Sequence, residues 1–224
     1  MDSIIFVLYT FSTMQNTCKE NFNELSNKVL SCTKCEDLIE LRKNPVPGVG
    51  ALNARIIIVS DYPRKDGAEA TGIPFTNDES GLLIRKIIED SSLSLENDIY
   101  LTYLVKCTPK KKVKAGKGEK ISEFAPAKIH KENCVAYLTK EITISTPHLL
   151  ISLGLDTTKF ILKYFFSINK KFNNMDELHM KIFKNPSFKL VPFYQPDDVT
   201  VLKRITMEKY ITDFETLSKL LKVV

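Results

Sequence analysis

The sequence predicts an α/β protein in which a parallel sheet is covered by helices on both faces. Two observations lead to this fold class. Short apolar runs bounded by turn residues recur at wide spacing along the 224 residues, as expected of strands that are buried on both faces. Between these runs, apolar residues recur at intervals of three and four, which is the period of an amphipathic helix. Strands that alternate with helices favour a parallel sheet.

The elements follow from these two periods. The predicted strands are the four apolar runs at 55–59, 99–105, 148–153 and 190–194. Helices are predicted between them at 79–90, 134–144 and 157–166. Two further helices, at 18–30 and 207–222, flank this core.

Composition indicates a single folded unit. Hydrophobic residues make up 43% and charged residues 26% of the chain, which suits a globular core. No apolar run approaches the roughly 18–20 residues that span a bilayer, and the apolar start MDSIIFVLYTF lacks the basic residues of a secretion signal. We expect residues 1–13 to be an N-terminal extension, with Met14 as the true start, or else a buried strand. Residues 14–224 are expected to form one domain of an intracellular monomer.

Five cysteines point to a metal site. An odd number argues against a disulfide framework. Cys32 and Cys35 form a C-x2-C pair, whose thiolates can bind one metal centre, while Cys107 and Cys134 lie far downstream. Four thiolates with one close pair suit a tetrahedral zinc and a 4Fe–4S cluster equally well. The fifth, Cys18, has no assigned partner and is interpreted as structural.

A lysine-rich segment interrupts the pattern of strands and helices. The stretch from Lys106 to Lys120 contains seven lysines together with Gly116 and Gly118, which predicts a mobile loop. A solvated loop and a loop that contacts phosphates both remain open. The net charge of +5 is compatible with nucleic acid without requiring it.

Seven short motifs follow one another along the chain: C-x2-C, PGVGALNARIIIVSDYPR, GIPFTNDESGLL, IYLTYLVKCTP, ENC, LISLG and VPFYQP. This series resembles the family 4 uracil-DNA glycosylases, the iron–sulfur branch of their superfamily. The resemblance implies a three-layer α/β/α sandwich with a four-stranded parallel sheet. It also implies a 4Fe–4S cluster held by Cys32, Cys35, Cys107 and Cys134. By comparison with the family, residues 108–125 are a lysine-rich insertion, which makes this segment longer than is usual for the family.

The resemblance places a catalytic carboxylate directly after the first predicted strand. The family's Gly-Glu-Ala-Pro-Gly motif corresponds here to Ser60-Asp61-Tyr62-Pro63-Arg64. Asp61 keeps a carboxylate that could order the attacking water, and Pro63 is retained. Ser60 and Arg64 replace two glycines and would crowd the turn, while Tyr62 adds a ring beside the substrate.

The implied base pocket differs from the family at two further positions. Phe75 matches the aromatic residue that stacks on the base. Tyr103 stands where the family has an asparagine that reads the uracil edge, and a phenol could make one of those bonds or fill the pocket. Gln195 replaces a histidine that donates to the uracil O2 as charge builds. Its amide can donate but carries no positive charge.

After the last predicted strand the family carries a loop that wedges into DNA. Leu202 is the predicted wedge, with Val201 as the alternative, and Lys203 and Arg204 are placed for phosphates. Two aspartates at 197–198 would repel DNA, so an ordinary connection is the competing interpretation.

His130 lies four residues before Cys134. We expect its side chain to face solvent from a helix. A covalent role at an abasic sugar, as in some relatives of the superfamily, is the alternative interpretation.

Two functions fit this pattern. The first is a uracil-DNA glycosylase-like enzyme of base-excision repair, which hydrolyses the N-glycosidic bond of uracil or another deaminated base flipped out of DNA. The alternative is a catalytically inactive iron–sulfur nucleic-acid-binding protein on the same fold. Asp61 and Phe75 favour the enzyme, whereas Tyr103 and Gln195 favour the binding protein. A zinc-stabilised domain unrelated to DNA is a third interpretation, which the series of motifs opposes.

Overall fold

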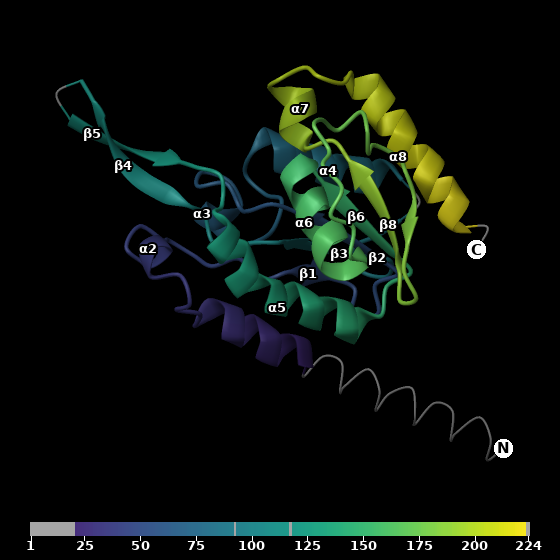
Figure 1. The fold of residues 1–224 in the computed structure, drawn as a ribbon, viewed down its shortest axis with the longest axis horizontal. Coiled ribbons are helices and arrows are strands. Elements are labelled where there is room, and N and C mark those ends of the chain that lie inside the picture. The colour runs from purple at the N-terminus through teal and green to yellow at the C-terminus, as the bar shows by residue number, and fades with distance from the viewer. Residues whose placement is uncertain (1–20, 92, 117, 223–224) are drawn as a thin grey trace, which may run out of the picture.

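The computed structural model of the chain describes residues 21–91, 93–116 and 118–222 (Figure 1). The predicted extension at 1–13 and the fifth cysteine, Cys18, lie outside these residues. No helix within the described ranges is long and apolar enough to cross a membrane.

A six-stranded sheet forms the centre of the molecule, in the order β1-β3-β2-β6-β8-β7. Its inner strands β3, β2, β6 and β8 are mutually parallel and correspond to the four predicted runs; they comprise Ile99–Tyr103, Ile56–Ser60, Leu149–Leu153 and Lys189–Phe193. The sheet is wider than the predicted four strands. Two-residue strands, β1 (Val49–Gly50) and β7 (Phe183–Lys184), pair antiparallel at its two edges, and strands this short carry no periodicity that a sequence could reveal.

Burial explains why the inner strands are continuous apolar runs. Every residue of β2, β3 and β6 is buried. A strand with polar residues on alternate positions would leave those groups without water on a covered face, so helices on both faces favour mostly Ile, Leu and Val. The buried polar residues of these strands, Ser60, Thr102 and Ser152, form side-chain hydrogen bonds.

Helices supply the outer layers. Residues 21–30 are helical and lie along α5 (Figure 1), where the Tyr137 hydroxyl donates to the Lys28 carbonyl at 3.2 Å. The remaining helices are α2 Glu36–Ile39, α3 Ala68–Thr71, α4 Glu79–Asp90, α5 Lys128–Ser145, α6 Leu155–Phe166, α7 Pro196–Thr200 and α8 Met207–Lys222. Helix α5 begins six residues before the predicted 134, immediately after its N-cap Ala127.

The lysine-rich segment is a β-hairpin, so the predicted mobile loop is wrong. Strands β4 (Lys110–Ala115) and β5 (Gly118–Glu123) pair antiparallel over six residues each. The register joins Ala115 to Gly118, and Gly116 turns the chain with a φ of 60°, as the favoured two-residue hairpin turns require. The hairpin projects from the domain as a separate arm (Figure 1).

Candidate active site and cysteine pocket

The candidate site lies where parallel strands end. Asp61 follows β2, Gly154 follows β6, and Gln195 comes shortly after β8. A cavity of about 710 Å³ opens beside these three residues. Ligand sites of open α/β sheets form outside the carboxyl ends of the strands, so the parallel topology itself places the cavity.

Asp61 is held at the floor of this cavity by three donors. Its Oδ1 accepts the backbone N–H of Tyr62 at 2.8 Å, the hydroxyl of Ser60 at 3.3 Å and the amide of Gln195 at 3.2 Å. Burial raises the pKa of the Asp61 carboxyl, and the nearby Arg64 guanidinium and these hydrogen bonds offset part of that effect. The result is an oriented, poorly hydrated carboxylate that can accept a proton from water.

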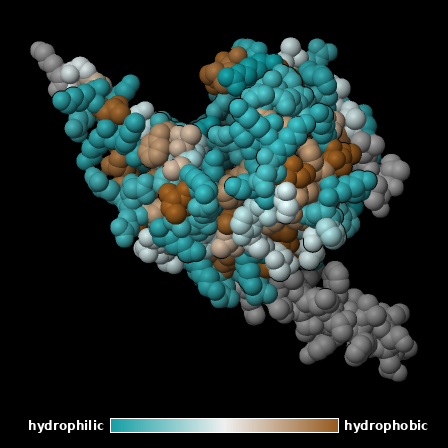
Figure 2. All heavy atoms as spheres, viewed as in Figure 1, coloured by the Kyte–Doolittle hydropathy of each residue, from teal (hydrophilic) through white to brown (hydrophobic). Residues whose placement is uncertain are grey.

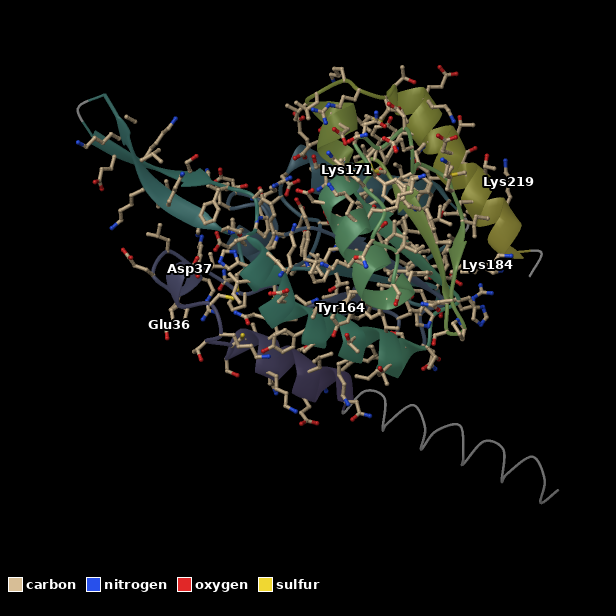
Figure 3. All side chains as sticks on the ribbon, in the orientation of Figure 1. Glu36, Asp37, Tyr164, Lys171, Lys184 and Lys219 are labelled. Atoms are coloured by element: carbon tan, nitrogen blue, oxygen red, sulfur yellow. The ribbon has the colours of Figure 1, made fainter. Side chains whose placement is uncertain are left out.

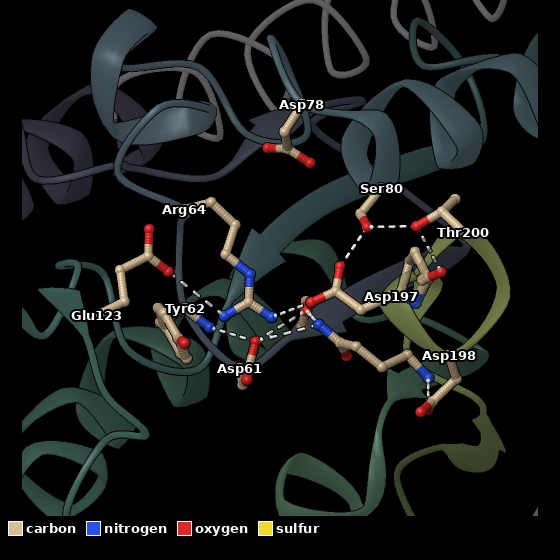
Figure 4. Close-up of polar contacts among 12 residues, drawn as sticks. Asp61, Tyr62, Arg64, Asp78, Ser80, Glu123, Asp197, Asp198 and Thr200 are labelled. Carbon is tan, nitrogen blue, oxygen red and sulfur yellow. Dashed lines mark hydrogen bonds and ion pairs between the residues drawn. The ribbon is translucent and has the colours of Figure 1, made fainter. Parts of the chain in front are cut away.

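Arg64 links three parts of the chain around Asp61 (Figure 4). Its guanidinium lies 2.6 Å from Asp197 Oδ2 in α7 and 3.8 Å from Glu123 Oε2 at the end of the hairpin. It also lies over the Tyr62 ring, 4.4 Å from the centroid. Arg64 therefore joins the site loop to two other elements, a role that its position in the sequence did not indicate.

The side chain of Gln195 is turned toward Asp61. Its Nε2 donates to the Ser60 hydroxyl at 2.9 Å as well as to Asp61, so the donor expected to serve a ligand is used within the protein. Its Oε1 is buried and has no hydrogen-bond partner. Gly154 leaves space for this group, because a Cβ there would lie 2.9 Å from Oε1. The free acceptor could receive an N–H or O–H from a molecule in the cavity.

Phe75 and Tyr103 lie together in a second, much smaller space. Their rings are stacked, with centroids 5.0 Å apart and 15° between the planes, and both residues are buried. The backbone N–H of Phe75 donates to the Tyr103 hydroxyl at 3.0 Å. The space beside them measures about 20 Å³, enough for little more than one water molecule. Tyr103 thus covers the face of Phe75.

Pro63 and the loop after α7 complete the site. The Pro63 carbonyl accepts the Thr108 hydroxyl at 2.6 Å, which ties the site loop to the base of the hairpin. Leu202 is half exposed and lines the large cavity together with Arg204. Lys203 is exposed and has a left-handed φ of 52°. Val201, the alternative wedge, is exposed.

The two aspartates of this loop form ion pairs and hydrogen bonds within the protein. Asp197 pairs with Arg64 and accepts the Ser80 hydroxyl. Asp198 is buried, accepts the Gln195 backbone N–H at 3.1 Å and pairs with Arg204 at 3.1 Å. Their charges are largely balanced within the protein, which weakens the repulsion of DNA expected from sequence.

The four expected cysteines line one pocket although they come from three parts of the chain. Cys32 and Cys35 lie between the helical residues 21–30 and α2, Cys107 follows β3, and Cys134 belongs to α5. Within the described ranges, no set of three or more His, Cys, Asp or Glu side chains converges closely enough to hold a metal ion.

Three of the four sulfurs accept hydrogen bonds. Asn133 Nδ2 lies 3.6 Å from the Cys35 sulfur, Arg42 Nη1 lies 3.8 Å from that of Cys107, and the Lys106 backbone N–H lies 3.4 Å from that of Cys134. Burial raises the pKa of the Cys134 thiol to about 12. A bound cation would favour the thiolate form of Cys134 over this effect of burial.

His130 does not face solvent, so that expectation is wrong. The side chain is buried, its Nδ1 accepts the Ala127 backbone N–H at 3.1 Å, and its Nε2 lies 2.8 Å from Asp37 Oδ2. Because Nδ1 accepts, the proton of a neutral ring is on Nε2 and points to Asp37. The ring fastens α5 to α2 beside the cysteine pocket.

The sequence did not predict the buried ion pair between Lys106 and Glu141. Lys106 Nζ lies 2.7 Å and 2.9 Å from the two carboxylate oxygens of Glu141, and both side chains are almost fully buried. Thr102 donates to the same carboxylate at 3.0 Å. Residues 101–110 are all buried, but the lysine-rich composition that begins at Lys106 predicts solvent-exposed side chains and gives no sign that this lysine is paired inside the protein.

The fold and the position of the site together define an α/β protein with a cavity at the carboxyl ends of parallel strands, which is where open sheets of this kind bind ligands. The family model of the uracil DNA glycosylase superfamily matches residues 47–215, a range that contains Asp61, Gln195 and the Phe75–Tyr103 pair but not Cys32 or Cys35. The chain belongs to the uracil DNA glycosylase superfamily.

Individual relatives agree with this assignment. A type-4 uracil-DNA glycosylase of Archaeoglobus fulgidus is 26% identical over 205 residues, covering 90% of this chain and 94% of the relative. The type-4 enzyme of Saccharolobus solfataricus is 30% identical over 164 residues, covering 73% and 68%. A type-5 uracil-DNA glycosylase of Pyrobaculum aerophilum is 23% identical over 215 residues, covering 84% and 88%.

Proposed function

We propose that this chain is a DNA-repair glycosylase that hydrolyses the N-glycosidic bond of uracil or another deaminated base in intracellular DNA. The observation that carries the proposal is the oriented carboxylate of Asp61 at the floor of the 710 Å³ cavity. The names of the type-4 relatives support the same substrate class.

The proposed chemistry needs a water molecule and a negatively charged carboxylate close to the sugar. As the bond to the base breaks, positive charge develops on the sugar ring. Asp61 stabilises that charge and takes a proton from the attacking water. Its hydrogen bonds to Tyr62 and Gln195 fix the direction of the carboxylate. Gln195 therefore acts first by positioning Asp61, and its free Oε1 can accept from the ligand.

The start of helix α6 and the basic residues after α7 support binding of the DNA backbone, while five aspartates also line the cavity. Helix α6 begins at the cavity, so its first backbone N–H groups are available to an anion. Thr157, in its first turn, is buried and lines the cavity, and its hydroxyl has no partner. Lys203 and Arg204 lie at the rim, where they would contact phosphates, and Leu202 would enter the space left by a flipped base.

We propose a 4Fe–4S cluster as the resident cofactor, held by Cys32, Cys35, Cys107 and Cys134. A zinc ion needs four sulfurs about 2.3 Å from one point, whereas the thiolates of a cluster bind different irons and stand further apart. Four cysteines that line one pocket can supply the four thiolates of such a cluster. The hydrogen bonds to three of the sulfurs would tune the reduction potential of such a cluster. The cluster would hold residues 32–42 against β3 and α5.

A second candidate function is binding of DNA without excision. The observation in its favour is the Phe75–Tyr103 stack, which occupies the face that a base would need. A base could enter only if the Tyr103 ring moved away.

One assay separates the two candidates. Protein purified without oxygen is incubated with single- and double-stranded oligonucleotides that contain uracil, hypoxanthine or xanthine, and alkali-labile cleavage is measured. Cleavage that is lost in Asp61→Asn supports the glycosylase. Tight binding of the same oligonucleotides with no cleavage of any of the three bases would favour the binding protein.

A further inference from the structure

The β4–β5 hairpin carries most of the net charge of the chain. Residues 110–123 contain six lysines and two glutamates, a net charge of +4 out of +5 for all 224 residues. The hairpin uses few of its side chains for packing, and most of them are exposed. Figure 3 shows its side chains projecting away from the rest of the domain.

The base of the hairpin is firmly attached beside the candidate site. Lys110 Nζ lies 2.5 Å from Glu69 Oε2, and both side chains are buried. Glu123 Oε1 accepts the Lys65 backbone N–H at 2.7 Å, and its other oxygen faces Arg64. The direction of the arm is therefore set by the same loop that carries Asp61.

The two faces of the arm differ in charge balance. On the first face, Lys110 pairs with Glu69, Lys112 lies 3.3 Å from Glu40, and Lys114 stands opposite Glu119 in the register. Every described lysine of this face has a carboxylate near it.

The second face carries lysines and no carboxylate. Because paired residues of an antiparallel ladder share a face, it consists of Lys111 with Ser122, Val113 with Lys120, and Ala115 with Gly118. Small residues near the tip would allow the backbone to come close to a partner. We call Lys111, Lys120 and Ser122 the acid-free face.

We propose that the hairpin is a DNA-binding arm whose acid-free face lies against the phosphates of duplex DNA outside the base pocket. A two-stranded ribbon fits the major groove of B-DNA, which is about 12 Å wide. Figure 2, viewed as Figure 1, shows the arm and the α7 end of the domain on the two sides of a wide notch.

Charge complementarity selects DNA as the partner. Protein interfaces are depleted in lysine and enriched in large apolar residues, and the acid-free face has the opposite composition. This inference rests on the proposed action on DNA but concerns residues that do not line the catalytic cavity.

Salt dependence of duplex binding tests the arm. The test variant is Lys111→Gln with Lys120→Gln, and the matched control is Lys112→Gln with Lys114→Gln on the first face. Each lost phosphate contact lowers the slope of log K against log salt by about 0.9. We expect the test variant to lose nearly two units of slope and at least tenfold in affinity for an undamaged duplex. The control should change much less.

The outcomes separate the arm from the catalytic proposal. Thermal melting first checks that both variants fold like the parent. If the two double variants show equal salt slopes, the proposal of a DNA-binding arm is wrong, whatever the excision assay gives. A selective loss of slope supports it even if no base is excised. If the parent chain fails to bind duplex DNA but binds a polyglutamate peptide through these lysines, the arm is a protein-binding surface and the inference is wrong.

Discussion

The ring of Tyr103 stacks on that of Phe75 at a centroid distance of 5.0 Å, and the Tyr103 hydroxyl oxygen accepts a hydrogen bond from the Phe75 backbone N–H. Arg85 holds the same segment by donating to the carbonyls of Pro74 and Phe75 at 2.8 and 2.7 Å. Phe75 itself has a left-handed φ of 54°. The aromatic pair is thus held by both side-chain and backbone contacts, and under the proposed function it would limit the entry of a base.

Replacing Tyr103 with asparagine should open this space. The Tyr103→Asn variant frees the face of Phe75 and supplies an amide that can both accept from and donate to a pyrimidine edge. We expect uracil excision under single-turnover conditions to rise at least tenfold. Loss of the buried ring should lower the free energy of unfolding by about 3–5 kcal/mol, measured by urea denaturation.

Tyr103→Phe is the matched control for this experiment. It keeps the ring in place but leaves the Phe75 N–H without its acceptor, at a cost of about 1–3 kcal/mol. Excision should stay at the parental level. If Tyr103→Asn also excises no faster than the parent, the aromatic pair is not what limits access of the base.

Asp61→Asn should abolish excision and stabilise the fold. Burial raises the pKa of Asp61 in the folded state, so folding disfavours its charged form. The stability contributed by the protonated group is lost as the pH rises through that raised pKa. The asparagine variant does not undergo this loss, because its side chain does not ionise. Its free energy of unfolding should exceed that of the parent by an amount that grows as the pH rises above the ordinary aspartate value of 3.8.

Activity should follow the same ionisation in the opposite sense. The parental excision rate is expected to rise with pH along an acid limb that lies above the ordinary aspartate value of 3.8, because only the carboxylate can accept a proton from water. Asp66→Asn, which alters an exposed carboxylate, is the control and should leave the profile unchanged. An acid limb that persists at full height in Asp61→Asn would assign the ionisation to another group.

Anaerobic purification should give a brown protein with about four irons per chain. Cys107→Ser is expected to lower the iron content and the melting temperature together, because residues 32–42 lose their attachment to β3. Cys18→Ser, outside the proposed ligand set, should retain its iron. A colourless protein with one zinc and no iron would show that the four cysteines hold a zinc ion and not a cluster.

The Lys106–Glu141 pair should be costly to break on one side only. Lys106→Met leaves the Glu141 carboxylate buried and unpaired, which typically costs about 3–5 kcal/mol. The double variant Lys106→Met with Glu141→Leu should recover most of that loss in urea denaturation. Lys112→Met, in an exposed pair with Glu40, should cost less than about 1 kcal/mol. Equal losses in the single and double variants would contradict an ion-pair origin.

The sequence by itself determined the class of fold and the order of its elements. Strands β2, β3, β6 and β8 begin within one residue of the predicted runs, and α4 has its predicted bounds. These features are local, because burial on two faces selects continuous apolar residues and a helix repeats every 3.6 residues. The C-x2-C pair and the motif around Asp61 are also local patterns, because each consists of residues that are close together in the sequence. The sequence therefore predicted them without knowledge of the fold.

Only the tertiary structure decided how distant groups meet. Gln195 donates to Ser60 across 135 residues of sequence, Arg64 reaches Asp197, and Tyr103 stacks on Phe75. The direction of a side chain depends on packing and on which partners are free, and no local pattern encodes either. The hairpin was missed because its pairing satisfies the backbone while its side chains remain exposed lysines. Its composition therefore predicts a loop, although cross-strand hydrogen bonds hold it as a ribbon.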